Sequence, residues 1–286
     1  PDLNQIVTRK TFSNWCQDSD RESLVMGILN ITPDSFSDGG RYFSVESALN
    51  QALSLIKDGA DIIDIGGEST RPGAKPLSLE DELDRVIPVI RAIREKESNR
   101  LISIDTTKSI VAEKAIEAGA DIVNDISGLT MDDEMSSVVA KLDVPVILMH
   151  RLGSSETMQQ NPVYNDIIQS IIDFFNQQIH LALSCGIAKN KIILDPGIGF
   201  GKTVDHNFTL IRKLDKFCEL GYPILIGPSR KAFIGATLDL PPEDRKEGTS
   251  AAVSAGILNG ARIVRVHDVK EMKRVVTITE KIRTAA

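Results

Sequence analysis

Eight short apolar runs alternate with eight amphipathic segments along this chain, and that alternation constrains the fold more than any other feature. The runs are rich in Ile and Val and mostly continuous, which is typical of strands covered on both faces. They span residues 24–29, 61–65, 101–105, 121–125, 144–150, 191–195, 223–227 and 262–267. An open doubly wound sheet also alternates strands and helices, but eight repeats favour an α/β fold of the (β/α)8 TIM barrel type.

The segments between the runs have helical spacing. One predicted apolar face consists of Ala48, Leu49, Ala52, Leu55 and Ile56, and another of Phe208, Ile211, Leu214 and Phe217. Further helices are expected near 79–97, 108–118, 132–141, 163–185, 246–259 and 268–284. A helix, a Gly stop and a strand recur in one layout at 58–64, 118–124 and 259–265, which supports a repeating βα unit.

We expect one barrel domain over residues 23–286, preceded by an N-terminal extension over residues 1–22. The extension contains Val7, Phe12 and Trp15, so it predicts a short apolar segment that closes the barrel floor.

Composition excludes several classes of protein. The net charge of −7 has no long basic run to offset it, which argues against a nucleic-acid partner. No apolar run approaches the roughly 20 residues that span a bilayer, so no membrane partner is expected. The three cysteines are scattered, which argues against a disulfide framework or a zinc site and favours the cytoplasm.

Most of the apolar runs end in, or soon after, a polar or charged residue. The carboxyl ends of barrel strands and the loops after them build the active site of such folds, so these side chains are expected to converge. The alternative for any single position is a helix cap or a turn. The residues in question are Asn30, Glu68, Asp105, Asn124, His150, Asp195, Ser229, Lys231, Arg265 and His267.

Two kinds of chemistry are predicted at these strand ends. Asp105, Asn124, Asp195 and Lys231 suit a flat heterocycle with a guanidine-like N–H edge and a carbonyl, because a carboxylate accepts two parallel N–H bonds.

The second set consists of Arg265, His267, Asn30 and Thr70, and it suits a phosphate group. The oxygen of Asn30 together with phosphate oxygens would form a partial shell for Mg²⁺. A flat ring beside a dianion indicates a leaving diphosphate.

Other polar residues favour structural roles. Asp61, Asp64 and Asp121 are interpreted as helix or barrel-floor salt bridges, and His150 as a satisfied histidine at the barrel mouth. Glu68 and Asp125 leave both possibilities open, a capping role or support of the residues that bind substrate.

Seven motifs carry a resemblance to a known family. The chain resembles the bacterial dihydropteroate synthases of the pterin-binding family from about Leu24 onward. The matching segments are 30–39 (NITPDSFSDG), 66–73 (GGESTRPG), 103–106 (SIDT), 124–128 (NDISG), 194–202 (LDPGIGFGK), 227–231 (GPSRK) and 265–269 (RVHDV).

The resemblance implies that 6-hydroxymethyl-7,8-dihydropterin diphosphate condenses with p-aminobenzoate to give 7,8-dihydropteroate and pyrophosphate, a step of folate biosynthesis. Diphosphate loss would leave a pterin cation that the aniline nitrogen attacks. It also implies bound Mg²⁺, a homodimer packed through its late helices, and inhibition by sulfonamides.

The resemblance also implies a role for individual residues. Asp105, Asn124, Asp195 and Lys231 would hold the pterin, Asn30 the Mg²⁺, and Thr70, Arg265 and His267 the diphosphate. Phe36, Arg71, Pro72 and Ser229 would line the p-aminobenzoate pocket, under loops 31–40 and 68–75. Phe200, Gly227 and Val266 complete the substrate contacts, and the catalytic roles would fall to Asp105, Lys231, Arg265 and His267.

Two other functions are weighed against this one. A pterin-dependent methyl carrier that serves a corrinoid needs neither a diphosphate site nor the Ser-Thr-Arg-Pro-Gly loop at 69–73. A non-catalytic pterin-binding paralogue would not require Lys231, Arg265 and His267 together.

Overall fold

The computed structural model describes residues 7–31, 41–69, 77–153 and 162–285, with the side chains of 41–44 left out. The predictions for Phe36, Thr70, Arg71 and Pro72 fall outside these ranges.

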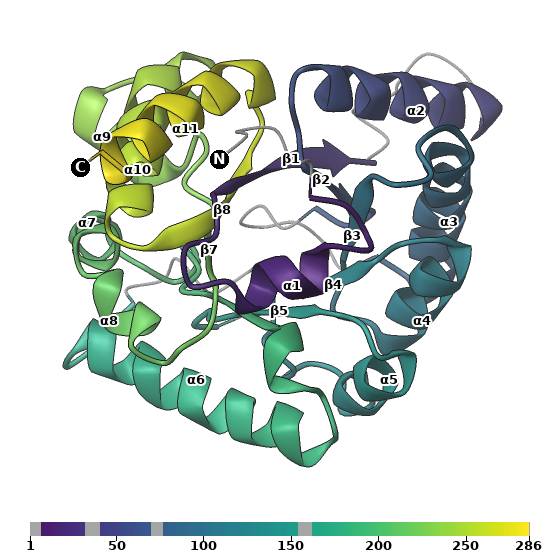
Figure 1. Ribbon diagram of the computed structural model, residues 1–286, viewed down its shortest axis with the longest axis horizontal. Coiled ribbons are helices and arrows are strands. Elements are labelled where there is room, and N and C mark those ends of the chain that lie inside the picture. The colour runs from purple at the N-terminus through teal and green to yellow at the C-terminus, as the bar shows by residue number, and fades with distance from the viewer. Residues whose placement is uncertain (1–6, 32–40, 70–76, 154–161, 286) are drawn as a thin grey trace.

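Eight parallel strands close into a barrel in sequence order, with each strand hydrogen-bonded to the next and β8 paired with β1 (Figure 1). The predicted TIM barrel is therefore confirmed. The strands are β1 (Leu24–Asn30), β2 (Ile62–Gly66), β3 (Leu101–Asp105), β4 (Ile122–Asp125), β5 (Val146–Met149), β6 (Ile192–Asp195), β7 (Ile224–Ile226) and β8 (Ala261–Val266).

Helices form the outer ring around the barrel (Figure 1). They are α2 (Arg41–Lys57), α3 (Leu79–Lys96), α4 (Ser109–Ala118), α5 (Met135–Leu142), α6 (Ile167–Ser184), α7 (Val204–Arg212), α8 (Asp215–Cys218), α9 (Ala232–Leu238), α10 (Lys246–Leu258) and α11 (Val269–Arg283). The described residues also contain two short 3₁₀ helices, η2 (Lys189–Lys191) and η3 (Pro242–Asp244).

The structure corrects the predicted helix through residues 208–217. The chain forms two helices there, α7 and α8, and Phe208 is 45% exposed instead of sharing a buried face with Leu214 and Phe217. The ring of Phe208 instead meets the ring of Phe233 on α9 edge-on, at 5.3 Å between centroids. Helix α9 was not predicted.

The barrel floor is an apolar layer covered by the N-terminal helix α1 (Phe12–Gln17), which lies across the barrel opening in Figure 1. Phe12 and Trp15 stack with ring centroids 5.4 Å apart and pack against inward side chains from the strand beginnings. The expected closure of the floor is therefore confirmed. The strand residues in this layer are Leu24, Met26, Ile62, Leu101, Ile122, Ile147, Ile193, Leu225 and Ile263.

Ion pairs rim the floor. Asp61 accepts from Lys273 at 2.7 Å and from the backbone N–H of Val25 at 2.8 Å, and Asp121 accepts from Arg94 at 2.6 Å and pairs with Arg9. The structural interpretation of Asp61 and Asp121 is confirmed.

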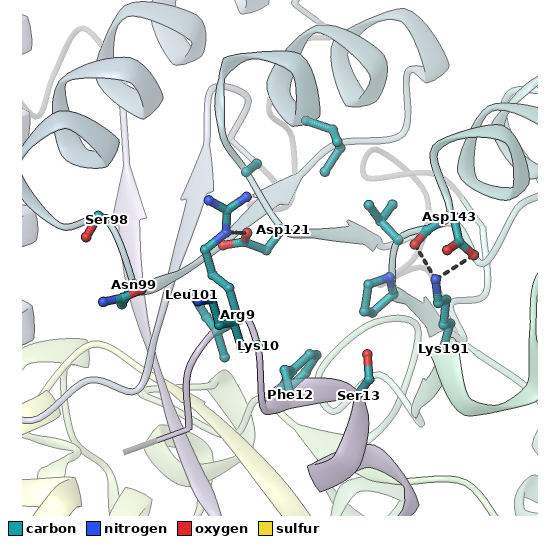
Figure 2. Close-up of a pocket in the computed structure, with 14 residues that line it drawn as sticks. Arg9, Lys10, Phe12, Ser13, Ser98, Asn99, Leu101, Asp121, Asp143 and Lys191 are labelled. Atoms are coloured by element: carbon teal, nitrogen blue, oxygen red, sulfur yellow. Dashed lines mark hydrogen bonds and ion pairs between the residues drawn. The ribbon is translucent and has the colours of Figure 1, made fainter. Parts of the chain in front are cut away.

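A cavity of about 440 Å³ opens beside α1 at this end of the barrel (Figure 2). On one wall Arg9 reaches Asp121, and on the other Lys191 pairs with Asp143 at 2.5 Å. The Arg9–Asp121 pair ties the N-terminal segment to the residue before β4.

Among the described residues, no helix is both long enough and apolar enough to span a membrane.

Candidate active site

The site begins two residues after the floor layer, on the same inward face of alternate strands. Side chains alternate between the two faces of a strand, so the residues two positions after Ile62, Ile122, Ile193 and Ile263 also point into the barrel. Those residues are Asp64, Asn124, Asp195 and Arg265, and Asp105 joins them from the end of β3.

Arg265 lies between two carboxylates. Its Nε donates to Asp64 Oδ2 at 2.6 Å and its Nη2 to Asp105 Oδ2 at 2.8 Å. Asn124 Nδ2 donates to both oxygens of Asp64 at 3.3 Å. The interpretation of Asp64 as a floor or helix salt bridge is therefore wrong, because its 0% exposed carboxylate is part of this cluster.

Charge is crowded in this cluster. Burial raises the pKa of Asp105 to about 7, against the lowering effect of Arg265, while nearby Asp64 raises it further. The pKa of Arg265 stays raised despite burial, because Asp64 and Asp105 stabilise its charge. The site therefore holds a fixed cation beside a carboxyl group that titrates near neutrality.

Asp195 follows the apolar run of β6 and is 5% exposed. Its Oδ1 accepts from the backbone N–H of Gly197 at 2.7 Å. Burial raises the pKa of Asp195 to about 6, and the Gly197 hydrogen bond opposes the rise. Gly197 has φ +71° and a Cβ there would lie 2.0 Å from the carbonyl oxygen of His150, so this turn requires glycine.

Lys231 lies over the ring of Phe200, with Nζ 3.9 Å from the ring centroid. Its aliphatic stem runs past Gly199, where a Cβ would come within 2.9 Å of Cδ. Burial lowers the pKa of Lys231 to about 8, with Arg265 adding to the effect and Asp195 opposing it. The loop after β6 and the loop after β7 thus meet through this cation–π contact.

Ser229 and His267 form a pair at the rim. Ser229 Oγ lies 3.0 Å from His267 Nδ1 and accepts the backbone N–H of His267 at 3.2 Å. Desolvation of the covered side of the ring, and then the charge of Arg265, lower the pKa of His267 to about 4, although the residue is exposed. Next to this pair, Arg230 donates to Asp268 at 2.9 and 2.6 Å.

Asn30 ends β1 beside Gly66, which pairs in register with both Asn30 and Asp105. Asn30 Oδ1 is 3.6 Å and Asp105 Oδ2 3.8 Å from the point where a Cβ on Gly66 would lie. No cluster of three or more His, Cys, Asp or Glu side chains fit for a metal occurs in the described ranges. The donors therefore suit Mg²⁺ only if substrate oxygens and water supply most of its shell.

The two residues left open have different surroundings. Asp125 accepts from Ser127 and Leu129 and so shapes the turn after β4. Glu68 accepts from Lys108 at 2.6 Å and from the backbone N–H of Leu77 at 3.2 Å.

Among the other predicted contacts, Gly227 lies beside Arg265, with 3.8 Å between the Arg265 Cβ and the point a Gly227 Cβ would occupy. Val266 belongs to the core between barrel and helices, so its side chain is directed away from the barrel interior.

Sequence reasoning missed two residues here, Asp64 and Lys202. Asp64 lies two positions after an inward floor residue, as Asn124, Asp195 and Arg265 do. That alternation along the strand could have shown from the sequence that Asp64 points into the barrel. Lys202 is 3% exposed and ends the glycine-rich segment 194–202, where its burial had no signal in the sequence.

Comparisons with known proteins identify the family of the chain. The model of the family described as pterin binding enzyme matches residues 26–267. A dihydropteroate synthase of Synechocystis is 50% identical over 263 residues, which cover 92% of this chain and 91% of that protein.

Solved structures are also similar to this chain. A dihydropteroate synthase from Clostridium difficile, crystallised in the presence of pteroic acid, has a TM-score of 0.87 and 47% identity and covers 93% of this chain and 98% of its own. The enzyme of Xanthomonas albilineans with 4-aminobenzoic acid has a TM-score of 0.87 and 41% identity, with coverage of 93% and 95%. This chain belongs to the pterin binding enzyme family and, within it, to the dihydropteroate synthases, which are transferases of folate synthesis.

Proposed function

We propose that this chain condenses 6-hydroxymethyl-7,8-dihydropterin diphosphate with p-aminobenzoate at the carboxyl end of the barrel. The observation that supports this most is the cluster in which Arg265 lies between Asp64 and Asp105, with Asp195 and Lys231 interacting with it electrostatically. At one end of the barrel, such a cluster provides carboxylates that can bind a heterocycle and cations that can bind a leaving dianion.

The pterin ring is assigned to Asp105, Asn124, Asp195 and Lys231. Ionised Asp195 suits the guanidine-like N–H edge, since a carboxylate accepts two parallel N–H bonds. Lys231, fixed over Phe200, suits the ring carbonyl or a ring nitrogen as a donor.

The diphosphate is assigned to Arg265 and His267, with Thr70 outside the described residues. When the Ser229 hydroxyl donates its proton to Nδ1, a neutral His267 carries its proton on Nε2 and can donate it to an anion. Preorganised donors of this kind stabilise charge that develops on a leaving group.

Bond breaking precedes bond making in this proposal. The C–O bond to the diphosphate breaks, leaving a cationic pterin methylene that Asp105 stabilises when ionised. The aniline nitrogen of p-aminobenzoate then forms a C–N bond to the methylene, and the resulting anilinium loses its proton to solvent. An aniline nitrogen is weakly basic and uncharged at neutral pH, so the step needs no strong general base.

Asn30, close to Asp105, is the residue of this chain that would hold Mg²⁺. The ion would supply Lewis-acid stabilisation to the diphosphate. Chelation by EDTA should lower the rate, and Mg²⁺ should restore it. When Mg²⁺ is titrated calorimetrically into the complex of the protein with inorganic pyrophosphate, the affinity for Mg²⁺ should be lower for Asn30→Ala than for the wild type.

We also propose a homodimer formed through α10 and α11. Apolar side chains are exposed along these helices, with Leu258 at 50%, Ile278 at 63% and Ile282 at 61%. The double variant Ile278→Glu and Ile282→Glu should sediment as a monomer while the wild-type chain sediments as a dimer. Monomeric wild-type protein would refute this part.

Pyrophosphate release tests the reaction. The chain should release pyrophosphate from the pterin diphosphate only when p-aminobenzoate is present, at a one-to-one ratio with dihydropteroate. A methyl carrier would release none under either condition. A non-catalytic paralogue would bind the pterin without turnover.

A further inference from the structure

Lys202 is a buried lysine that the reaction proposed above does not use. It ends the segment that follows β6, and its side chain turns back under the same loop. We propose that Lys202 is a positioning residue for the pterin half of the site: its ammonium fixes the loop that carries Asp195 and Phe200. The inference rests on the proposed function of that half-site.

Three acceptors surround the Lys202 ammonium. Nζ donates to the carbonyl oxygen of Phe200 at 2.8 Å and to that of His150 at 3.2 Å, and it lies 3.1 Å from His150 Nδ1. Burial lowers the pKa of Lys202 to about 7, while the charge of Asp195 opposes that change. In its charged form the ammonium has three N–H donors and no acceptor, so His150 Nδ1 accepts the third. The ring of His150 is therefore neutral with its proton on Nε2. Burial, and then the charge of Lys202, lower the pKa of His150 to about 3, which agrees with this state.

These contacts close a ring of interactions around Asp195. His150, at the end of β5, donates its backbone N–H to the carbonyl oxygen of Asp195 at 2.9 Å. The carboxylate of Asp195 accepts from Gly197, and a Cβ on Gly197 would lie 3.3 Å from Lys202 Nζ. Lys202 therefore ties the far end of the loop to His150, and the backbone N–H of His150 holds the Asp195 end.

The loop in turn supports the second pterin residue from β7. Lys231 has its stem against Gly199 and its ammonium over the Phe200 ring. Lys202 holds the Phe200 backbone through the carbonyl oxygen of Phe200. A shift of that backbone would move the ring on which the Lys231 ammonium lies. The positive charge of Lys202 also favours ionised Asp195.

If Lys202 only supported the fold, its loss would give a different pattern of defects from the one that a positioning role predicts. Loss of a fold contact lowers stability and impairs both substrates together. Loss of the Lys202 network should act on the pterin side, because Ser229, which is assigned to the p-aminobenzoate pocket, is held by hydrogen bonds with His267.

The test compares three variants in the full chain. Lys202→Ala removes the stem and the ammonium and leaves space for a small amine, whereas Lys202→Met fills that space without a donor. Lys216→Ala is the matched control, because Lys216 is an exposed lysine whose ion pair with Glu219 lies on α8 and the residue that follows it.

For Lys202→Ala we expect kcat/KM for the pterin diphosphate to fall roughly 100-fold, the size of effect that follows misplacement of a binding group. The KM for p-aminobenzoate should change by less than about threefold. Propylammonium in the buffer should raise kcat/KM for the pterin diphosphate about tenfold in Lys202→Ala. It should leave kcat/KM unchanged in Lys202→Met and in Lys216→Ala.

With Lys202→Ala, two results would overturn the inference: unchanged kinetics for the pterin diphosphate, or equal losses for both substrates without rescue by propylammonium. If Lys202→Ala does not fold, His150→Phe tests the same network, and calorimetry with pterin-6-carboxylate should then show weakened binding. Unchanged binding of pterin-6-carboxylate in His150→Phe would also overturn the inference.

The failure of this inference can be told apart from the failure of the proposed function. Absence of pyrophosphate release in the wild-type chain would refute the proposed function. An active wild type with an unimpaired Lys202→Ala would refute only this inference.

Discussion

The floor and the mouth of the barrel are built from the same strands, two residues apart, and their chemistry is opposite. At the floor, Ile62, Ile122, Ile193 and Ile263 pack under Phe12 and its neighbours on α1. At the mouth, the next inward positions are Asp64, Asn124, Asp195 and Arg265.

The difference shows where stability and function separate in this fold. Burial of apolar surface at the floor stabilises the chain, whereas the mouth holds carboxylates and cations that would be more stable in water. Charges at the mouth are retained because they bind substrate, which follows the general division of labour between the two ends of TIM barrels. The predictions below test that division.

Removal of Arg265 should have the largest effect. Arg265→Ala should lower kcat/KM roughly 10³-fold, about 4 kcal/mol, because a preorganised cation is lost from the transition state. The variant should also be less stable, since Asp64 stays buried without its cation.

The double variant Arg265→Ala with Asp64→Asn separates these two effects. It removes the unpaired carboxylate, so its melting temperature should recover while pyrophosphate release stays low. Recovery of activity together with stability would show that Arg265 acts only through the fold.

Truncation at the floor should give the opposite pattern. Phe12→Ala removes a 2% exposed ring from the layer under the strands and should cost about 3 kcal/mol of unfolding free energy. The kcat/KM of the folded enzyme should stay within about twofold of wild type. Urea denaturation and steady-state kinetics at saturating Mg²⁺ measure the two quantities. A parallel loss of activity would break the separation of floor and mouth.

The dependence on pH should reflect the mouth alone. Asp195 has its pKa raised to about 6, so it is protonated below that pH and cannot accept both N–H bonds. Lys231 has its pKa lowered to about 8, so it loses its charge above that pH. Asp105 has its pKa raised to about 7 and acts in its ionised form, so it adds to the acid limb. We expect kcat/KM for the pterin diphosphate to be bell-shaped with its maximum between about 7 and 8, and to fall more than tenfold per pH unit below 6, where both carboxyl groups are protonated. A profile that stays flat from about pH 5 to about pH 10 would contradict these assignments.

The smallest effect is expected for an ion pair at the floor. Arg9 is half exposed, and its partner Asp121 keeps Arg94 when Arg9 is removed. Arg9→Ala should lower the unfolding free energy by about 0.5 kcal/mol and leave kinetics unchanged. A change in KM for either substrate would show that the floor cavity communicates with the mouth.

Much of the fold could be predicted because the strand signal is long and repeated. The run Leu101–Asp105 matches β3 at both ends, and the remaining strands differ from prediction by one or two residues at their ends. The predicted helix at 208–217 failed because the apolar spacing continues across a break between α7 and α8, and periodicity alone does not register a change of direction.

The site was predictable where a polar residue ends an apolar run, as at Asp105 and Asp195. Asp64 was misjudged because it lies inside its run, between Ile63 and Ile65, where a floor salt bridge was the simpler expectation. Only the closed barrel shows that it faces Arg265 across 201 positions of sequence. Lys202 could not be predicted, because its partners are mainly backbone carbonyl oxygens.

A crystal structure with the pterin diphosphate bound tests the central claim most directly. We predict that the guanidine-like edge of the ring lies within hydrogen-bond distance of Asp195, about 3 Å, and the diphosphate beside Arg265 and His267. Density for the pterin outside this mouth, for example in the floor cavity beside Arg9, would contradict the account.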